Sequence, residues 1–224
     1  MPIGPAHGHI SETTAVRIPA VGVLLNADLA IPVGAEAVIA FAHGSGSGRH
    51  STRNRYVAET LNGYGFATLL ADLLTEEEEI IDLRTRHLRF DIPMLAGRLV
   101  DIAAWLQRES QTKHLKIGWF GASTGAGAAL IAAALHPDNI MAVVSRGGRP
   151  DLAEDYLPAV IAPVLLIVGE NDPEVLELNK WALARLNAPS KLEIIPNATH
   201  LFEEPGTLEA AALLAAQWFQ GNLK

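Results

Sequence analysis

A stretch in the middle of the chain decides the fold: residues 115–130 read LKIGWFGASTGAGAAL. The first six of these residues predict a buried strand, and residues 123–135 are small and apolar on all sides, as a central buried helix requires. Between them, GASTG at residues 121–125 fits G-x-S-x-G, the tight turn that lifts a serine hydroxyl above the carboxyl edge of a sheet. We therefore expect Ser123 at a strand-to-helix turn rather than within a membrane span, although residues 117–135 carry no charge.

The same alternation of strand and helix patterns runs through most of the chain. Short apolar runs predict further parallel strands at residues 37–42, 66–70, 140–144, 164–168 and 192–195. Helical patterns follow or precede them at residues 51–63, 91–107, 173–186 and 207–219. This rhythm predicts an α/β fold with a mostly parallel, twisted sheet of about seven or eight strands flanked by helices.

Three intervals complete the prediction. Runs at residues 16–18, 21–25 and 29–31, separated by Pro19 and Asn26, predict opening antiparallel strands. Residues 75–90 form a polar interval with four consecutive glutamates, which we interpret as a solvated loop or helix start and as a mobile cover. Only 18 residues separate Val144 from Pro163. That connection leaves no room for a large lid domain.

Bulk composition limits the function classes. With 224 residues, 49% of them hydrophobic, the chain is predicted to form one soluble domain over residues 1–224. The net charge of −8 argues against a nucleic-acid partner, and the lack of cysteine excludes disulfides and a cysteine nucleophile. The N-terminus resembles no signal peptide, so we expect a cytoplasmic protein. We also expect a monomer or homodimer without a membrane span.

A serine hydroxyl needs a base before it can act as a nucleophile, and the base needs an acid to orient it. His200 lies in PNATHLFEEPG, directly after the predicted strand at residues 192–195. Asp172 follows PVLLIVGEN, between Ser123 and His200 in the chain. This gives the order Ser, Asp, His that accompanies the G-x-S-x-G turn, with Glu170 and Glu174 as rival acids.

Two backbone N–H groups must also face the oxygen that becomes negative during acyl transfer. We expect one from Thr124, which follows the nucleophile, and one from Ser45 in the glycine-rich loop HGSGSG at residues 43–48. A strand, a glycine-rich turn and a helix also describe nucleotide-binding folds. However, Arg49 stands where G-x-G-x-x-G needs its last glycine, and no Gly-Lys-Ser/Thr occurs.

Taken together, these segments resemble the α/β-hydrolase superfamily and, within it, the dienelactone-hydrolase-like branch of small hydrolases. The resemblance extends from HGSGSGRHSTRNR at residue 43 to NATHLFEEPG at residue 206. It implies the α/β-hydrolase fold with Ser123, Asp172 and His200 as a catalytic triad. Dienelactone hydrolases proper carry a cysteine nucleophile, and this chain departs from them by having serine.

The remaining candidates are weaker. Arg146 and Arg149, in SRGGRPD, could hold a substrate carboxylate, or they could form surface or structural pairs. His43 is interpreted as a structural hydrogen-bonding residue, and His7 and His9 form only a minimal metal-binding pattern. No metal or organic cofactor is implied.

The leading hypothesis is a carboxylic-ester hydrolase that works through an acyl-enzyme on a small-molecule ester or related acyl substrate. The alternatives are a lactone, thioester or amide hydrolase with the same apparatus, and a catalytically silent α/β-hydrolase that serves as a binding module.

Overall fold

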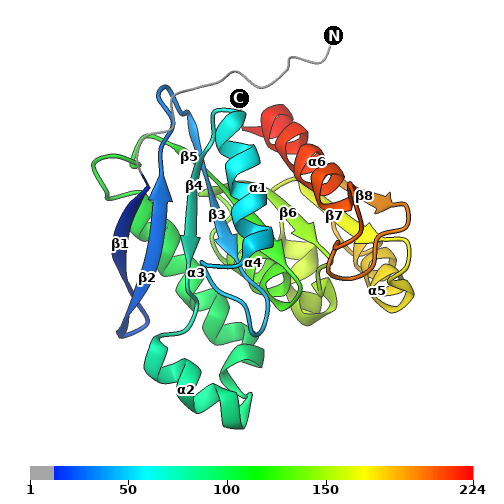
Figure 1. Ribbon diagram of the computed structural model, residues 1–224, viewed down its shortest axis with the longest axis horizontal. Coiled ribbons are helices and arrows are strands. Elements are labelled where there is room, and N and C mark those ends of the chain that lie inside the picture. The colour runs from blue at the N-terminus through cyan, green and yellow to red at the C-terminus, as the bar shows by residue number, and fades with distance from the viewer. Residues whose placement is uncertain (1–12, 224) are drawn as a thin grey trace.

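A computed structural model describes residues 13–223 of the chain. An eight-stranded sheet runs through it in the order β1-β2-β4-β3-β5-β6-β7-β8 (Figure 1). The pairs β1–β2 and β2–β4 are antiparallel, and all the other pairs are parallel. This confirms the predicted α/β-hydrolase fold and its mostly parallel sheet.

The elements follow the predicted order. The strands are β1 (Thr14–Ala20), β2 (Val23–Ala30), β3 (Ala37–Ala42), β4 (Ala67–Ala71), β5 (Lys116–Ala122), β6 (Ile140–Arg146), β7 (Val164–Gly169) and β8 (Ser190–Ile195). The α-helices are α1 (Thr52–Gly63), α2 (Glu76–Thr85), α3 (Ile92–Leu106), α4 (Thr124–Leu135), α5 (Pro173–Leu183) and α6 (Thr207–Asn222). Two 3-10 helices are η1 (Leu88–Phe90) and η2 (Pro150–Ala159). Because η2 occupies the connection between β6 and β7, the expected absence of a large lid at that point is confirmed.

The N-terminal hairpin differs from its prediction. Pro19 lies inside β1 instead of ending it, and the turn is formed by Val21 and Gly22, both with positive φ. β1 is the edge strand of the sheet, so the missing N–H of proline can face away from a partner strand. Asn26 pairs with Arg17 in the middle of the hairpin, so the two runs predicted on either side of Asn26 form the single strand β2.

The polar interval at residues 75–90, predicted as a solvated loop or helix start, forms α2 and η1. Thr75 caps α2: its hydroxyl accepts from the Glu78 N–H, and the Glu78 carboxylate accepts from the Thr75 N–H. The same carboxylate accepts two hydrogen bonds from buried Arg98 of α3, at 2.5 and 2.7 Å. α2 extends away from the sheet at the lower edge of Figure 1.

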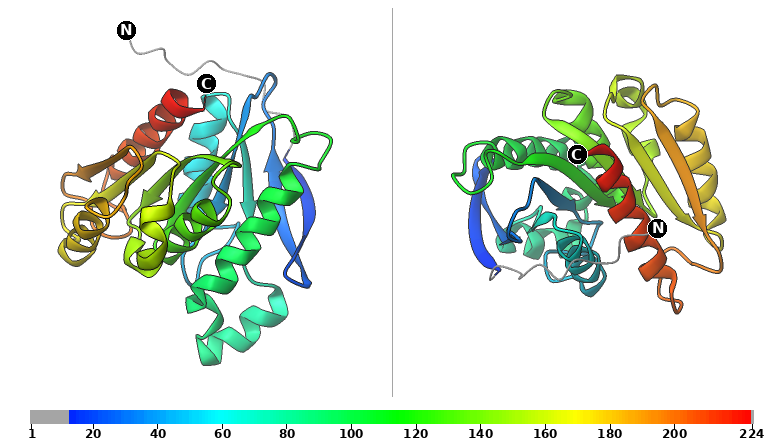
Figure 2. Two further views of the ribbon diagram at one scale, coloured as in Figure 1. Left: turned by 180° about the vertical axis from the view of Figure 1, so that it is seen from behind. Right: turned by 90° about the horizontal axis from the view of Figure 1, so that it is seen from above.

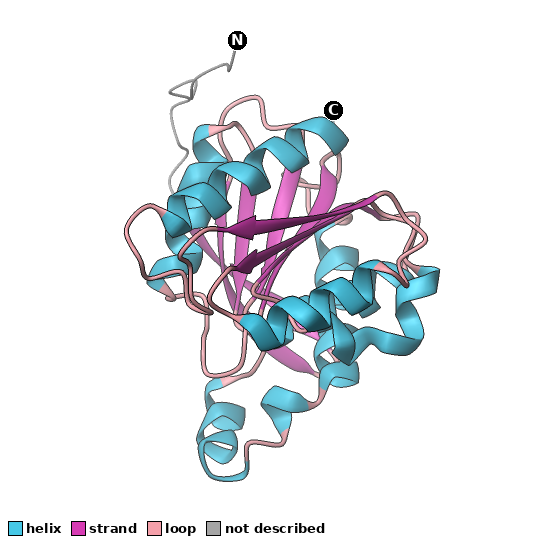
Figure 3. Cartoon of the chain, turned by 90° about the vertical axis from the view of Figure 1, so that its right-hand side faces the viewer, coloured by secondary structure: helices cyan, strands magenta, loops and turns pink. Residues whose placement is uncertain are grey.

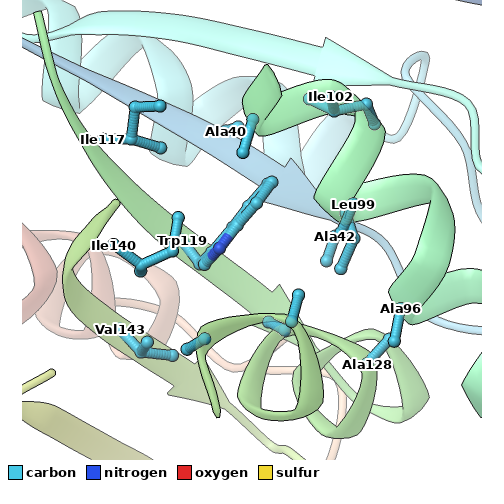
Figure 4. Packing of buried hydrophobic residues seen from close by; sticks show 14 of the residues in the cluster. Ala40, Ala42, Ala96, Leu99, Ile102, Ile117, Trp119, Ala128, Ile140 and Val143 are labelled. Carbon is cyan, nitrogen blue, oxygen red and sulfur yellow. The ribbon is translucent and has the colours of Figure 1, made fainter. Parts of the chain in front are cut away.

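Helices cover both faces of the sheet (Figures 2 and 3). α1 and α6 pack together on one face, and α3, α4 and α5 cover the other. On the latter face the fully buried Trp119 of β5 lies among Ala40, Ile117 and Leu99 (Figure 4). These layers hold the sheet rigid, which fixes the carboxyl edge where β3, β5, β6 and β7 end.

None of the helices within residues 13–223 has the length and apolar character needed to cross a membrane.

Candidate active site

Ser123 lies at the turn between β5 and α4, as predicted. Its backbone has φ 51° and ψ −125°, a strained conformation for a residue with a side chain. The Ser123 N–H donates to the Arg146 carbonyl of β6 at 3.3 Å, which ties the turn to the neighbouring strand. This is the geometry in which a serine hydroxyl stands clear of the sheet edge.

The two outer residues of GASTG must be glycine, because a side chain at either position would overlap with neighbouring backbone atoms. A Cβ added at Gly121 would lie 2.5 Å from the Cα of Ala126, and one at Gly125 would lie 2.1 Å from the carbonyl oxygen of Ala42. No real Cβ makes such contacts with backbone atoms. The motif is therefore set by the close packing of α4 against β3 and β5.

We expect Gly125→Ala to destabilise the protein by about 3 kcal/mol, because the added methyl forces β3 and α4 apart. Gly63→Ala is the matched control, since a Cβ at Gly63 meets nothing within 4 Å and the site is helical. Its effect should stay below about 1 kcal/mol. Urea unfolding of both variants measures the difference, and equal midpoints would contradict this account of the motif.

His200 and Asp172 are brought together from two loops. The Nδ1 atom of His200 lies 2.7 Å from Oδ2 of Asp172, whose carboxylate is mostly buried. Asp172 occupies the N-cap position of α5, where an aspartate usually accepts from the helix backbone, but its side chain makes no cap hydrogen bond. Its carboxylate is directed to His200 instead.

The rival acids lie elsewhere. Glu170 accepts a hydrogen bond from the Asn197 N–H at 2.9 Å, and Glu174 lies in the first turn of α5. Neither carboxylate is hydrogen-bonded to His200 among the contacts of residues 13–223. The geometry thus favours Asp172 as the partner of the imidazole.

Two glycines let the His200 loop lie close to the sheet. A Cβ at Gly169, the end of β7, would lie 2.3 Å from the carbonyl oxygen of Ala198. A Cβ at Gly147 would lie 3.2 Å from the carbonyl oxygen of His200. Glu204 closes the loop by accepting from the N–H and hydroxyl of Thr199 at 3.0 and 2.6 Å. The loop that carries His200 therefore lies against the ends of β6 and β7 and is closed by Glu204.

Ser123 and His200 line one cavity of about 230 Å³, which we call the nucleophile cavity. Its other polar side chains come from the glycine-rich loop and the residue that caps α1 (Ser45, Ser47, Ser51), from α1 itself (Arg53, Asn54) and from the end of β6 (Arg146). Within the described chain the Ser123 hydroxyl makes no hydrogen bond to His200. Such contacts are commonly long before substrate binds, so a shared cavity is the geometry a nucleophile and its base require.

The glycine-rich loop forms one wall of this cavity. Gly44 lies directly against the nucleophile, since a Cβ there would lie 2.9 Å from Ser123 Cβ and 3.6 Å from its Oγ. The Ser45 N–H, predicted to face the substrate oxygen, donates to Thr124 Oγ1 at 3.0 Å. Thr124 is the first residue of α4, so its own N–H has no acceptor in a preceding helical turn.

The loop is held by polar residues at its two ends. His43 is buried; its Nε2 accepts from the Leu73 N–H at 2.9 Å, and Nδ1 lies 3.0 Å from the Gly44 carbonyl. Burial lowers the pKa of His43, which keeps the ring neutral and fits the structural role predicted for it. At the other end Arg49 forms an ion pair with Asp72.

The two candidate arginines differ sharply. Arg149 makes a bidentate ion pair with Asp151 at 2.7 and 2.8 Å, so its charge is already matched. Arg146 is buried, lines the nucleophile cavity and has no carboxylate partner in the described residues.

Two further residues of the cavity were not predicted from the sequence. Arg53 and Asn54 reach the same cavity from α1, and their positions in a helical pattern gave no signal.

A larger cavity of about 590 Å³ adjoins the glycine-rich loop and shares Gly44, Ser45 and Ser47 with the nucleophile cavity. Glu76, Glu79 and Asp82 of α2 line it, together with Arg89, but Ser123 and His200 do not. No group of three or more His, Asp or Glu side chains within residues 13–223 is placed to hold a metal ion. His7 and His9 fall outside the described residues.

Comparison with known proteins decides the family. The model of the dienelactone hydrolase family matches residues 25–220. The chain belongs to the dienelactone hydrolase family. A crystal structure of dienelactone hydrolase from Anabaena variabilis is similar to it with 58% identity and a TM-score of 0.94, covering 95% of this chain and 99% of that one.

A more distantly similar structure shares the fold. Est1E from Butyrivibrio proteoclasticus is 19% identical with a TM-score of 0.78, over 92% of this chain and 98% of that chain. The chain is also 56% identical, over 93% of its length, to a protein of Mycobacterium tuberculosis provisionally named a phosphoribosyl transferase. It covers 46% of that protein, so the chain spans about half the length of the curated relatives it matches.

Proposed function

We propose that this member of the dienelactone hydrolase family is a serine hydrolase that cleaves a carboxylic ester through an acyl-enzyme. The observation that carries the proposal is the pairing of His200 with Asp172 at the cavity in which Ser123 stands on its strained turn. Nucleophile, base and orienting acid come from three different loops. An arrangement this specific is costly to maintain without a use.

In the proposed reaction, Ser123 Oγ attacks the acyl carbon while Nε2 of His200 takes the hydroxyl proton. Asp172 holds the proton of Nδ1, which leaves Nε2 free to accept, and it stabilises the imidazolium that forms. The Thr124 N–H and the loop backbone beside Gly44 stabilise the oxyanion. His200 then protonates the leaving alcohol, and water, activated by the same imidazole, releases the acid from the serine.

The Ser45 N–H has a defined part in this scheme. Its hydrogen bond to Thr124 Oγ1 keeps the glycine-rich loop beside the nucleophile. The oxyanion, a stronger acceptor than a hydroxyl, can compete for the same N–H when substrate binds. Ser45 and Thr124 therefore remain the proposed pair of oxyanion donors.

A lactone is a cyclic ester, and the same residues could open one. The name of the Anabaena variabilis relative favours this second candidate. The serine at position 123 separates the chain from dienelactone hydrolases proper, which carry a cysteine nucleophile, so a carboxylic ester remains the leading candidate.

We expect a fluorophosphonate to label the folded protein at one serine only, Ser123. The reagent reacts with an activated hydroxyl. Of the four serines that line the cavity with the carboxylate-oriented His200, Ser123 is the one on the strained strand-to-helix turn. Peptide mass spectrometry locates the adduct, and p-nitrophenyl esters from acetate to octanoate measure turnover in parallel. Protein unfolded in urea is the control and should not react.

Labelling at another serine, or equal labelling of folded and unfolded protein, would overturn the assignment. A folded wild type that is labelled but hydrolyses no ester in the series points to a lactone or thioester substrate. A folded protein that is neither labelled nor active is the silent binding module.

A further inference from the structure

Helix α5 carries a fully buried asparagine. None of the surface of Asn179 is exposed, and the other buried residues of the helix are the apolar Val175 and Ala182. The Asn179 amide donates two hydrogen bonds, to the Val175 carbonyl at 2.8 Å and to the Gly148 carbonyl at 2.9 Å. The first bond stays within the helix. The second reaches the end of β6, 31 residues away in the chain.

Burial of this amide is unfavourable in itself. The Oδ1 atom of Asn179 is buried and has no hydrogen-bond partner in the described residues, and an unpaired buried acceptor normally destabilises a fold. A leucine of similar size would pack in the same place without that cost. Packing alone therefore favours an apolar residue here, and what the asparagine adds is its bond to Gly148.

The carbonyl that Asn179 holds belongs to residues 147–149, which we call the β6 loop. In the peptide group between Gly148 and Arg149, the carbonyl accepts from Asn179 and the N–H donates to the Ser123 carbonyl at 3.0 Å. A peptide group is planar and stiff, so fixing its oxygen also fixes the direction of its N–H. Asn179 therefore orients the donor that holds the nucleophile's own carbonyl.

The first residue of the β6 loop lies against the base. A Cβ at Gly147 would be 3.6 Å from Nδ1 of His200, the atom that faces Asp172. A Cβ at Gly148 would lie 1.9 Å from Oγ of Ser145, so the loop packs directly on the end of β6. Because the loop contacts the nucleophile at one end and the base at the other, a shift of the loop changes their relative position.

We propose that Asn179 is a positioning residue, which fixes the Gly148–Arg149 peptide and thereby holds Ser123 in the geometry that proton transfer to His200 needs. The inference rests on the proposed function, to which it adds a side chain outside the triad. α5 carries Asp172 at its N-cap position and Asn179 two turns later, so the helix that places the acid also holds the turn of the nucleophile.

We expect Asn179→Leu to lower the limiting rate of fluorophosphonate labelling, and kcat for p-nitrophenyl acetate, about 10- to 100-fold. Misplacing reacting groups by about 1 Å has an effect of this size. The half-saturating concentration of the reagent should change less than about threefold, because Asn179 is not among the residues that line the nucleophile cavity. The concentration dependence of labelling measures both quantities.

Two further variants separate the two bonds of Asn179. Asn179→Ser has a hydroxyl that can still donate to the Val175 carbonyl but is too short to reach Gly148. It should lose the labelling rate as the leucine variant does, and it replaces that variant if leucine prevents folding. Asn179→Gln keeps an amide donor and should recover part of the rate.

Val175→Ala is the matched control for a purely structural role. It removes buried apolar surface from the same helix and leaves both bonds of Asn179 in place, since the Val175 acceptor is a backbone carbonyl. Its melting temperature should fall, while its labelling rate, measured well below the melting temperature, should stay within about twofold of wild type.

A second measurement does not depend on chemistry at Ser123. Hydrogen exchange of the Arg149 N–H should become at least about tenfold faster in Asn179→Leu, and not in Val175→Ala, relative to the Gly147 N–H. The latter donates to the Ile167 carbonyl at 2.8 Å and serves as an internal reference. If wild type is neither labelled nor active but this difference is found, the link through Asn179 stands and the proposed function is rejected.

A wild type that is labelled at Ser123 and an Asn179→Leu protein labelled at the same rate would overturn the proposal and leave the proposed function intact. Equal losses of rate in Asn179→Leu and Val175→Ala would overturn it as well, because they would show that the asparagine contributes stability alone.

Discussion

Ser123→Ala is expected to lower kcat for p-nitrophenyl esters by about 10⁴- to 10⁶-fold. Without the hydroxyl no acyl-enzyme forms, and only the residual acceleration from substrate binding and the oxyanion donors remains. The backbone of the turn is held by the Ser123 N–H bond to Arg146 and by the contacts of Gly121 and Gly125, none of which uses the hydroxyl. Thermal unfolding should therefore change little, and steady-state kinetics of the purified variant measures the effect.

Ser145→Ala is the matched control for this experiment. Ser145 lies on β6, opposite Gly121 in the sheet, and its buried hydroxyl has no hydrogen-bond partner in the described residues. Removing that hydroxyl costs no hydrogen bond, so activity should remain within about twofold. A Ser123→Ala protein as active as the Ser145→Ala protein would refute the serine mechanism.

The centre of the fold could be predicted because its signals are local. The run LKIGWF and the motif GASTG placed β5, the turn and α4 within one or two residues, since the glycines at 121 and 125 are demanded by contacts that only this turn creates. The pairing of Asp172 with His200 was also predicted from position, since each follows directly after a strand that ends at the same sheet edge.

The errors arose where distant residues decide the structure. Pro19 was predicted to interrupt a strand, but at an edge of the sheet a missing N–H costs little. For residues 75–90 the prediction left a loop and a helix start both open, although Thr75-x-x-Glu78 is the signature of a helix start. The segment is held by Asp82, which accepts hydrogen bonds from the Leu88 and Arg89 N–H groups, and by the contact of Glu78 with Arg98, 20 residues further along the chain. The second contact has no local pattern in the sequence.

The difference between Arg146 and Arg149 has the same origin. Both are arginines in SRGGRPD, and the sequence gives them equal claim to a substrate. Arg149 finds Asp151 two residues away, whereas Arg146 points between aromatic rings from β5 and the His200 loop. Arg146 has no carboxylate partner because of how β5, β6 and the His200 loop pack together, and this packing cannot be predicted from the local sequence.

Asp172→Asn is expected to lower kcat about 10⁴-fold, with little change in stability. An asparagine of the same shape can turn its amide toward Nδ1 of His200 and donate to it, which moves the imidazole proton to Nε2. That nitrogen then cannot take the proton of Ser123. Because the Asp172 carboxylate makes no cap hydrogen bond in α5, the helix does not depend on its charge.

The rival acids provide the controls. Glu174→Gln should keep kcat within about threefold, since its carboxylate lies outside the nucleophile cavity and makes no hydrogen bond to His200. In Glu170→Gln the amide oxygen can still accept the hydrogen bond from the Asn197 N–H, so kcat should likewise stay within about threefold of wild type. Steady-state kinetics and the rate of fluorophosphonate labelling, compared across the three variants, separate the assignments. If kcat fell less than about tenfold in Asp172→Asn and fell further in one of the two glutamine variants, the acid would have to be reassigned. If all three variants stayed active, His200 would work without a carboxylate partner.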